Sequence, residues 1–379
     1  MTSMLADNKL PDLRAGLLAD VVTPSVIVLA DRVRYNVDRM IDVAGSADRL
    51  RPHCKTHKMS AVVKILLEKG ITRHKAATIA EVEMLADAGA TDIVFAYNPV
   101  GPNIARVVEI AKRFPDVTFA VTADHEQPLR QLASAAAAAG VSVGVLLDVD
   151  PGLHRTGLDP RSNDALNLYR LISELAGVRP AGFHVYDGHQ HQHTLDERRA
   201  AVMKEWPEVI SLKRRCEDAG LAVPELLCGG TPTFPVYAEL DEPAIALSPG
   251  TAIFHDAGYG QFDDLPFEPA ALVATRVISR SAPNRVTVDL GNKSVAADPP
   301  KGARVVFPDL PDAKQVIHNE EHLVLETDRA KNFQPGDLLL GIPMHICPTI
   351  ALHPDVTVIE NGEITGRWEV TARNHRLTI

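Results

Sequence analysis

Cysteine is scarce in this chain, and the few cysteines present form no pattern. The four are Cys54, Cys216, Cys228 and Cys347, and no two of them have CxxC spacing. A disulfide framework is therefore not expected, and a reducing compartment such as the cytoplasm is favoured. The sequence also lacks an apolar run of about 18 residues, which a membrane-spanning helix requires. Residues 1–18 lack the apolar core of a signal peptide, so we expect a cytoplasmic protein with no membrane partner.

Basic runs and aromatic residues are also few. The net charge is −10 and no long basic run occurs, so nucleic acid is not expected as a main partner. Aromatic residues make up 5% whereas alanine is abundant, which favours a helix-rich α/β protein over a β-sandwich. The 379 residues are too many for one ordinary core and suit two domains. A small anionic ligand is still compatible with this composition, because local cations matter more than the total charge.

Short apolar strands and amphipathic helices alternate from residue 25 to about residue 260. Glycines stand at several positions where helix C-termini are expected, for example Gly89 and Gly140. Eight such β/α units predict a closed parallel (β/α)8 barrel, with a doubly wound open sheet as the alternative. The expected barrel strands are 49–53, 74–78, 93–97, 117–121, 142–148, 181–186, 225–229 and 244–247.

Helical periodicity ends near residue 260, and short β-rich segments separated by glycine and proline follow. This change predicts a separate β domain. The strand at 25–29 is surplus to the barrel, and we expect it to pair with the β domain. The predicted domains are therefore 31–260 and 261–379, the second taken together with 1–30. The expected strands of the β domain are 271–279, 285–290, 303–307, 315–318, 337–341 and 356–360.

The segment Arg51-Pro52-His53-Cys54-Lys55-Thr56-His57-Lys58 gathers cations and imidazoles directly after the first expected barrel strand. Barrel active sites lie at the C-terminal ends of the strands. Neighbouring cations favour the uncharged, nucleophilic form of a lysine amine, which forms a Schiff base with pyridoxal phosphate. Lys55 is the candidate for this role and Lys58 is its rival. For an isolated lysine, a solvated cationic loop would be the simpler interpretation.

Two glycine turns and a His-x-Cys pair provide further candidate ligands. Gly229-Gly230-Thr231 and Gly250-Thr251 follow the last two expected barrel strands. Many barrels bind a phosphate there through backbone N–H groups, to which threonine hydroxyls can add donors. His345 and Cys347 are two residues apart, so on a strand their side chains would face the same way. Imidazole with thiolate suits zinc best, with manganese, cobalt and iron as alternatives.

Taken in order, these motifs resemble the D-threonine aldolase and D-serine dehydratase family over about residues 20–375. Its members are fold-type III pyridoxal phosphate enzymes, with an alanine racemase-like barrel and a C-terminal β domain. The resemblance implies that Lys55 holds pyridoxal 5'-phosphate and that His345 and Cys347 bind a divalent metal such as zinc or manganese. The segments that carry it include 51–55, 148–157, 229–233, 250–260, 289–293 and 345–349.

The resemblance also implies roles for residues between these motifs. Arg155 should lie near the cofactor hydroxyl or the substrate carboxylate, although a structural ion pair with Asp148 or Asp150 is a simpler interpretation. Tyr186 ends the sixth expected strand, and we expect it to form a hydrogen bond with the pyridine nitrogen, with a core tyrosine as the alternative. His53, His189 and His191 are candidate catalytic residues; a His-rich metal site or solvent exposure are the alternatives for the last two. The remaining expected cofactor contacts are Gly230, Thr231, Gly250, Thr251 and Tyr259.

The expected activity is retro-aldol cleavage of small D-3-hydroxy-α-amino acids to glycine and an aldehyde. Dehydration to a keto acid and ammonia is the alternative, because aldolases of the family generally carry His-x-Asp where this chain has His345-x-Cys347. The tail from Pro348 to Arg373 resembles the aldolases instead. A non-catalytic cofactor-binding protein fits poorly with the large β domain. A metallohydrolase barrel requires metal ligands with HxH spacing, which the first expected barrel strand lacks. By analogy with related barrels, we expect a homodimer.

Overall fold

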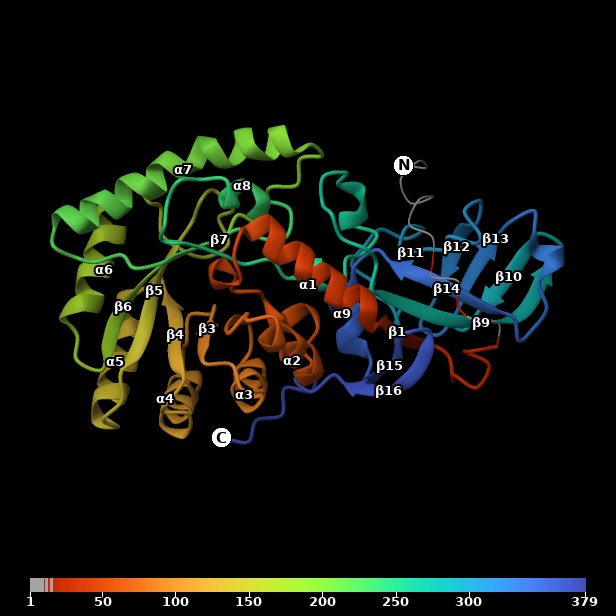
Figure 1. Ribbon diagram of the computed structural model, residues 1–379, viewed down its shortest axis with the longest axis horizontal. Coiled ribbons are helices and arrows are strands. Elements are labelled where there is room, and N and C mark those ends of the chain that lie inside the picture. Colours follow the sequence, from red (N-terminus) through yellow and green to blue (C-terminus); the bar gives the residue numbers. More distant parts are fainter. Residues whose placement is uncertain (1–9, 11–12, 14–15) are drawn as a thin grey trace. The chain divides into compact units, whose positions relative to one another are not determined.

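The computed structural model describes residues 10, 13 and 16–379, which form two compact units (Figure 1). The barrel unit consists of Met40–Lys55, Val62–Gly250 and Asn374–Ile379. The β unit comprises Thr56–Ala61, Thr251–Arg373 and the described residues up to Arg39. The rest of the predicted segment 1–30, namely residues 1–9, 11–12 and 14–15, lies outside the described residues.

A seven-stranded parallel sheet, in which each strand pairs with the next along the chain, forms the centre of the barrel unit. A doubly wound sheet would reverse its strand order at a switch point, so this order excludes that alternative. Isolated bridges connect Leu50 to Leu247 and His53 to Lys75, so the segment containing Leu50 and His53 joins the two edges of the sheet. The strands are β2 (Arg73–Ala76), β3 (Asp92–Phe95), β4 (Thr118–Ala123), β5 (Val143–Val149), β6 (Val178–Val185), β7 (Leu226–Cys228) and β8 (Ile245–Leu247).

The expected strand at 49–53 is wrong in detail, because only these two bridges form there. Pro52 has no N–H to donate, so it interrupts any regular ladder at this point. The chain then tightens into a 3-10 helix at Cys54–Thr56. Lys55 is therefore presented from a single turn of helix directly after the bridge at His53.

Helices follow most of the strands, and several of them begin at polar caps. Thr78 accepts a hydrogen bond from the N–H of Glu81 at the start of α3, and Thr194 forms a capping box with Glu197 at the start of α7. Each cap satisfies backbone groups that the first turn of a helix leaves without partners. The helices that begin or lie in this unit are α2 (Ser60–Glu68), α3 (Ile79–Asp87), α4 (Asn103–Arg113), α5 (Glu126–Ala138), α6 (Asn163–Glu174), α7 (Leu195–Asp218) and α8 (Phe234–Ala238).

Small and branched apolar side chains from successive strands fill the core of the barrel unit. Leu146 and Leu227 are 1% exposed, and burying each contributes roughly 1.5–3 kcal/mol to folding. Gly144 keeps the strands close, since a Cβ there would lie 2.9 Å from the Cβ of Ala120. The buried members of this cluster are Val94, Ala120, Leu146, Leu227 and Ala246.

The β unit is built on a mostly antiparallel sheet of nine described strands. The N-terminal strand β1 pairs antiparallel with β9 and parallel with β15, which confirms that segment 25–29 belongs with the later strands. The strands are β1 (Ser25–Leu29), β9 (Ala271–Ala282), β10 (Arg285–Val288), β11 (Val305–Val306), β12 (Lys314–His318), β13 (Leu323–Glu326), β14 (Leu338–Pro343), β15 (Asp355–Glu360) and β16 (Glu363–Glu369). Two helices also belong to it in whole or part, α1 (Ala30–Ala44) and α9 (Ile346–Leu352).

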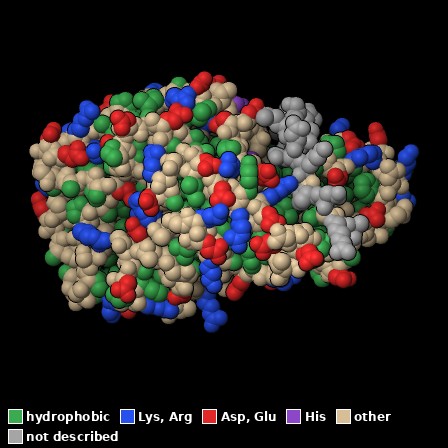
Figure 2. All heavy atoms as spheres, in the orientation of Figure 1, with side chains coloured by type: hydrophobic (Ala, Val, Ile, Leu, Met, Phe, Trp, Pro, Cys, Tyr) green, Lys and Arg blue, Asp and Glu red, His purple; other side chains and the backbone are tan. Residues whose placement is uncertain are grey.

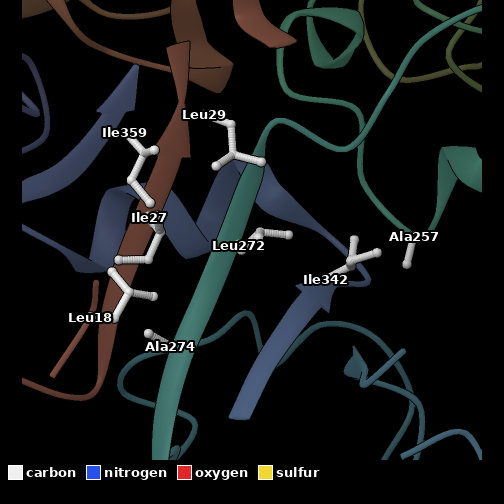
Figure 3. Close-up of a cluster of buried hydrophobic side chains, with 8 residues drawn as sticks. All are labelled: Leu18, Ile27, Leu29, Ala257, Leu272, Ala274, Ile342 and Ile359. Carbon is white, nitrogen blue, oxygen red and sulfur yellow. The ribbon is translucent and has the colours of Figure 1, made fainter. Parts of the chain in front are cut away.

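One cluster of the core of the β unit lies on one face of this sheet (Figure 3). Ile27 and Leu29 of β1 point to the same side as Leu272 of β9, because residues two apart on a strand share a face. Ile342 from β14 and Ile359 from β15 extend the cluster. A segment from the start of the chain thus completes a core made by its end.

Charged side chains of both signs are interspersed on the face of the molecule that Figure 2 shows. Within the described residues, no helix combines the length and apolar character needed to cross a bilayer.

Candidate active site

Two of the predicted site residues of the barrel unit, Lys55 and Arg155, meet at the ring of a third, Tyr186. Tyr186 follows β6 by one residue, at the end of the barrel where the strands terminate. The Nζ atoms of Lys55 and Lys75 lie 5.7 Å and 5.4 Å from the centroid of its ring, and the Cζ atom of Arg155 lies 4.8 Å from it. Three basic side chains from three separate segments therefore surround one aromatic ring. The sequence argument identified Lys55, Arg155 and Tyr186 but missed Lys75.

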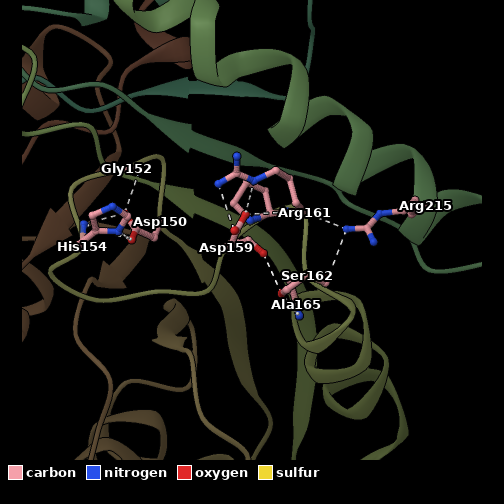
Figure 4. Close-up of polar contacts among 9 residues, drawn as sticks. Asp150, Gly152, His154, Asp159, Arg161, Ser162, Ala165 and Arg215 are labelled. Carbon is pink, nitrogen blue, oxygen red and sulfur yellow. Dashed lines mark hydrogen bonds and ion pairs between the residues drawn. The ribbon is translucent and has the colours of Figure 1, made fainter.

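Two of these basic groups have no carboxylate partner. Among the described residues, neither Lys55 nor Arg155 forms an ion pair, which excludes the simpler interpretation of Arg155 as a partner of the neighbouring acids. Asp150 instead accepts hydrogen bonds from the N–H groups of Gly152 and His154 and contacts Nδ1 of His154 at 2.8 Å (Figure 4). That carboxylate holds the loop that presents Arg155. Cations without protein counter-ions are suited to an anionic ligand.

Asp148, His184 and Lys75 form a buried chain of polar contacts next to Tyr186. Asp148 of β5 and His184 of β6 are paired in the sheet, with Oδ1 and Nδ1 2.8 Å apart. His184 Nε2 lies 3.4 Å from Lys75 Nζ. Burial raises the pKa of Asp148, but the hydrogen bond from His184, the charge of that ring, Thr156 and Arg155 outweigh it and hold the pKa below its usual value. Burial lowers the pKa of His184, and so does Lys75.

The glycine turns expected to bind a phosphate are held by threonine hydroxyls. The N–H of Gly230 donates to Thr233 Oγ1 at 3.1 Å, and the N–H of Gly250 donates to Thr231 Oγ1 at 3.2 Å. Thr233 in turn donates to Asp187, whose pKa is raised to about 6 by burial despite that hydrogen bond. Both turns are thereby fixed in place.

Glycine is also required beside the Tyr186 ring. A Cβ on Gly188 would lie 2.4 Å from Cε1 of the ring, and one on Gly230 would lie 3.4 Å from Cε2. The backbone therefore approaches the ring from two sides, which leaves its position well defined. The expected cofactor residues Gly230 and Tyr186 therefore lie next to each other.

The three candidate catalytic histidines have different surroundings. His53 is buried, and its Nδ1 accepts the N–H of Lys55 at 3.3 Å, so it helps to orient the turn that carries this lysine. His189 Nε2 contacts the side chain of Gln190 at 2.9 Å, and burial lowers its pKa. His191 is exposed. A direct role for His53, His189 or His191 in proton transfer stays a prediction.

Arg51, the first residue of the lysine motif, is structural. Its side chain is 4% exposed and pairs with Asp92 at 2.8 Å and with Glu225 at 3.0 Å. Arg73 contacts the same two carboxylates. The network ties the segment before Lys55 to the starts of β3 and β7.

Replacing Arg51 with alanine is expected to lower the free energy of unfolding by about 3–5 kcal/mol, because it leaves charge from a largely buried pair without its partner. Chemical denaturation monitored by circular dichroism measures this. Arg130→Ala removes an exposed pair with Glu126 and should leave the stability nearly unchanged. Equal effects of the two variants would contradict a structural role for Arg51.

His345 and Cys347 lie at the junction between β14 and α9 in the β unit. The expectation that both stand on a strand is wrong: β14 ends at Pro343, His345 is the N-cap of α9 and Cys347 lies in its first turn. Their side chains nevertheless form a hydrogen bond, and His345, as the cap, has extended and not helical backbone angles. Burial lowers the pKa of His345, but a hydrogen bond with Cys347 and the charge of that group, followed by Asp298, raise it to about 9.

Two carboxylates support the His345–Cys347 pair. Asp298 Oδ2 lies 2.5 Å from Nδ1 of His345, which leaves Nε2 of the ring for a ligand; such carboxylate–histidine pairs are common around metals. The buried Asp256 accepts hydrogen bonds from the N–H groups of Ile346 and Tyr259. Burial raises the pKa of Asp256 to about 6, although these hydrogen bonds oppose the shift. Tyr259, an expected cofactor residue, is thus held to the same turn as the predicted metal ligands.

Thr251 also lies beside the His345–Cys347 pair, with its Oγ1 atom 3.5 Å from Cys347 Sγ. Thr56 Oγ1 lies 3.3 Å from the same sulfur. Cys347 is partly exposed, so its sulfur is not sealed in a core. An imidazole, a thiol and a carboxylate that orients the ring form a donor set that fits zinc or a similar divalent ion.

A second group in the barrel unit also has metal-ligand chemistry. The ligand atoms of His53, Cys54 and Glu81 all lie within 4.8 Å of one another, and the three side chains are buried. Glu81 already accepts the N–H of Ala77 at 2.6 Å and contacts Cys54 Sγ at 3.6 Å, so it also anchors the N-terminus of α3. The sequence argument missed this group, because Glu81 is far from the other two in sequence.

The residues of the barrel unit fit pyridoxal phosphate. Lys55 supplies a primary amine, Arg155 supplies donors for anionic oxygens, and the Tyr186 ring offers a planar contact surface. Near Tyr186, His184 stacks with it at 6.4 Å between ring centroids and 14° between planes. The arrangement can hold an anionic aromatic ligand and bring an amine to it.

Two family models match the chain. Residues 28–257 match the N-terminal domain of alanine racemase, and residues 270–359 match a putative serine dehydratase domain. D-threonine aldolase of Arthrobacter sp is 30% identical over 94% of both chains, and D-threo-3-hydroxyaspartate dehydratase of Delftia sp. is 24% identical over 92% of this chain and 96% of its own. The crystal structure of D-threonine aldolase from Filomicrobium marinum has a TM-score of 0.87 and 29% identity, covering 95% of this chain and 97% of its own.

Fold and site together define an alanine racemase-like barrel enzyme with a dehydratase-type β domain. The expected fold class is thereby confirmed. The chain belongs to the D-threonine aldolase and D-serine dehydratase family, whose members are pyridoxal phosphate-dependent lyases. These relatives are named for small D-amino acids as substrates.

Proposed function

We propose that this chain is a pyridoxal phosphate- and divalent metal-dependent lyase that cleaves D-3-hydroxy-α-amino acids by a retro-aldol reaction. The observation that carries the proposal is the group of Lys55, Arg155 and Tyr186, in which an amine and a guanidinium flank one ring and neither has an ion-pair partner within the described part of the chain. Two relatives that match 94% of this chain are aldolases by name, at 30% and 27% identity.

Each residue has a role in this proposal. Lys55 tethers the cofactor, which supplies an electron sink for negative charge at Cα when it is bound. Arg155 binds an anionic oxygen of the cofactor or the substrate, and Tyr186 holds its ring plane beside the amine. His345 and Cys347 would hold the metal, which would supply Lewis acidity to the reaction when bound. Asp298 orients His345 for this task.

Dehydration to a keto acid and ammonia is the second candidate. The observation that favours it is the contact between His345 and the thiol of Cys347, since dehydratases of the family generally carry His-x-Cys at this motif. Relatives named as D-threo-3-hydroxyaspartate dehydratase and D-serine dehydratase are each 24% identical to this chain. Both candidates use the same cofactor and the same type of substrate, so they differ only in the bond that breaks.

D-threonine separates the two candidates in one incubation with added cofactor and manganese or zinc. Glycine and acetaldehyde in equal amounts are the expected products. Ammonia and 2-oxobutanoate instead would establish dehydration, and L-threonine, which has the opposite configuration at Cα, serves as the control that should yield neither pair. If D-threonine, D-serine and D-3-hydroxyaspartate all remain unchanged, the proposed function is wrong.

A further inference from the structure

Lys75 is a second amine at the Tyr186 ring, and its environment is unusual for a lysine. Its side chain is buried, with the residue 3% exposed, although lysines are almost never fully buried unless paired. It stands on β2, and its backbone bridges His53, two residues before Lys55. Among the described residues, the hydrogen-bond partner of its Nζ atom is His184, not a carboxylate.

The contacts of His184 decide which atoms carry protons. Asp148 is ionised near neutral pH, since its pKa lies below the usual value, so it can only accept a hydrogen bond. Nδ1 of His184 must therefore donate to Asp148, and in a neutral ring Nε2 must accept. Lys75 then donates one N–H to Nε2 of His184. The rest of the amine group points away from His184.

An ammonium group has three donors and a positive charge to satisfy, whereas a neutral amine has two donors and a lone pair. With one imidazole as its partner in a buried position, Lys75 is better accommodated as the neutral amine. Burial lowers its pKa to about 7, and Lys55 and Arg155 lower it further while Asp148 and Asp187 oppose the shift. These groups and His184 are the charged and titratable neighbours that act on it.

We propose that Lys75 accepts the proton that leaves Cα of the substrate and donates the proton that returns to it, while Lys55 holds the cofactor. His184 and Asp148 are positioning residues that fix the orientation of the Lys75 amine. This inference rests on the proposed function, because it assigns a proton carrier to that same site. It distinguishes two lysines that lie at nearly equal distances from one ring.

The proton balance of the reaction requires a group that can accept a proton from Cα and donate one to it. When the Cα–H bond breaks, the proton passes to the lone pair of Lys75 Nζ and the electron pair stays at Cα. When the bond forms again, the Lys75 ammonium returns a proton to Cα. In the retro-aldol reaction the electron pair comes from the Cα–Cβ bond, and the 3-hydroxyl group gives up its proton as the aldehyde forms. One proton is added at Cα by the protonated form of Lys75, so the proton count is unchanged. No oxidant or reductant is involved.

Exchange of the Cα proton of glycine in heavy water tests the role of Lys75, because it needs only this proton transfer. The holoenzyme should exchange glycine, and the rate should fall as the pH drops through about 7, where the protonated Lys75 can no longer accept a proton. Lys75→Met should retain the visible colour of the bound cofactor but exchange about 10²–10⁴-fold more slowly. Mass spectrometry of glycine measures the rate.

Two further variants separate proton transfer from charge and from folding. Lys75→Arg keeps a cation but does not release its proton, so it should be as slow as Lys75→Met; recovery of the wild-type rate would overturn proton transfer. Lys75→Gln retains an N–H donor toward His184 and takes the place of the methionine variant if that protein does not fold. Lys213→Met, which removes a lysine paired with Glu217 on α7, is the matched control and should exchange normally.

The outcomes distinguish this inference from the proposed function. A coloured Lys75→Met protein that exchanges glycine at the wild-type rate would overturn the role of Lys75 and leave the proposed function standing. A coloured wild-type enzyme that does not exchange glycine would do the same. A wild-type protein that binds no cofactor would instead overturn the proposed function.

Discussion

The Lys55→Arg variant is expected to be a folded, colourless protein whose lyase activity is lower by roughly 10³-fold or more. Arginine keeps a positive charge near Tyr186, but its guanidinium is not a primary amine and does not lose its proton at working pH. The fold should survive, because Lys55 is only partly buried and forms no ion pair among the described residues. The visible spectrum, the cofactor content after gel filtration and the initial rate with D-threonine measure the effect.

Lys58→Arg is the control for this variant. Lys58 is the other lysine of the motif, and its arginine variant should keep both the colour and the activity. Borohydride reduction of the wild-type holoenzyme followed by peptide mapping locates the cofactor directly. A pyridoxyl group on Lys58 or Lys75, with Lys55 unmodified, would show that the assignment of the tethering lysine is wrong.

The sequence indicated the barrel well because most of its strands are short apolar runs closed by polar or glycine-rich turns. The expected segments 93–97 and 142–148 overlap β3 and β5 with shifts of one or two residues at their ends. The segment 49–53 is the exception, because only two isolated bridges form there. There Pro52 and the following helical turn prevent a regular ladder.

The strands of the β unit were harder to predict from the sequence. β13 and β16 were not expected at all. Nearly every residue of β16 is exposed, so its sequence lacks the alternation of apolar and polar residues on which strand prediction depends. It is a strand because β15 offers it an antiparallel partner, which is a property of the fold and not of the segment.

The same distinction applies to the site. Lys55 could be found because it lies in a short motif with its own cluster of cations. Lys75 could not, since it reaches the site through the bridge between His53 and Lys75, and only the sheet brings those residues together. The pairing of Asp148 with His184 is likewise a matter of strand register. His345 and Cys347 were found for a reason that the structure corrects, because a helix start and not a strand brings them into contact.

The Cys347→Ala variant is expected to lose its divalent metal on dialysis, with metal affinity lower by roughly 10²-fold or more. The thiolate is one of two protein ligands in the predicted site, so its removal leaves His345 alone on the ion. Activity should fall with the metal content, as it should in wild-type protein treated with EDTA. Metal analysis after dialysis measures the affinity, and D-threonine turnover measures the activity.

Cys54→Ala is the matched control, because Cys54 belongs to the other group of potential ligands, with His53 and Glu81. It should keep its metal. The opposite result, with metal lost from Cys54→Ala and kept by Cys347→Ala, would show that the ion binds in the barrel unit. The His-x-Cys pair would then have no part in the proposed function. Metal content alone decides between the two sites, whatever Cys54→Ala does to the rate.

Cys347→Asp tests the nature of the ligand rather than its presence. A carboxylate also binds divalent ions, so this variant should retain metal, but its harder oxygen should shift the preference from zinc toward manganese. Aspartate is also the residue that aldolases of the family generally carry here. If the thiolate is what favours dehydration, Cys347→Asp should raise the ratio of acetaldehyde to 2-oxobutanoate formed from D-threonine. An unchanged ratio would mean that the bond that breaks is chosen by residues around the substrate, not by this ligand of the metal.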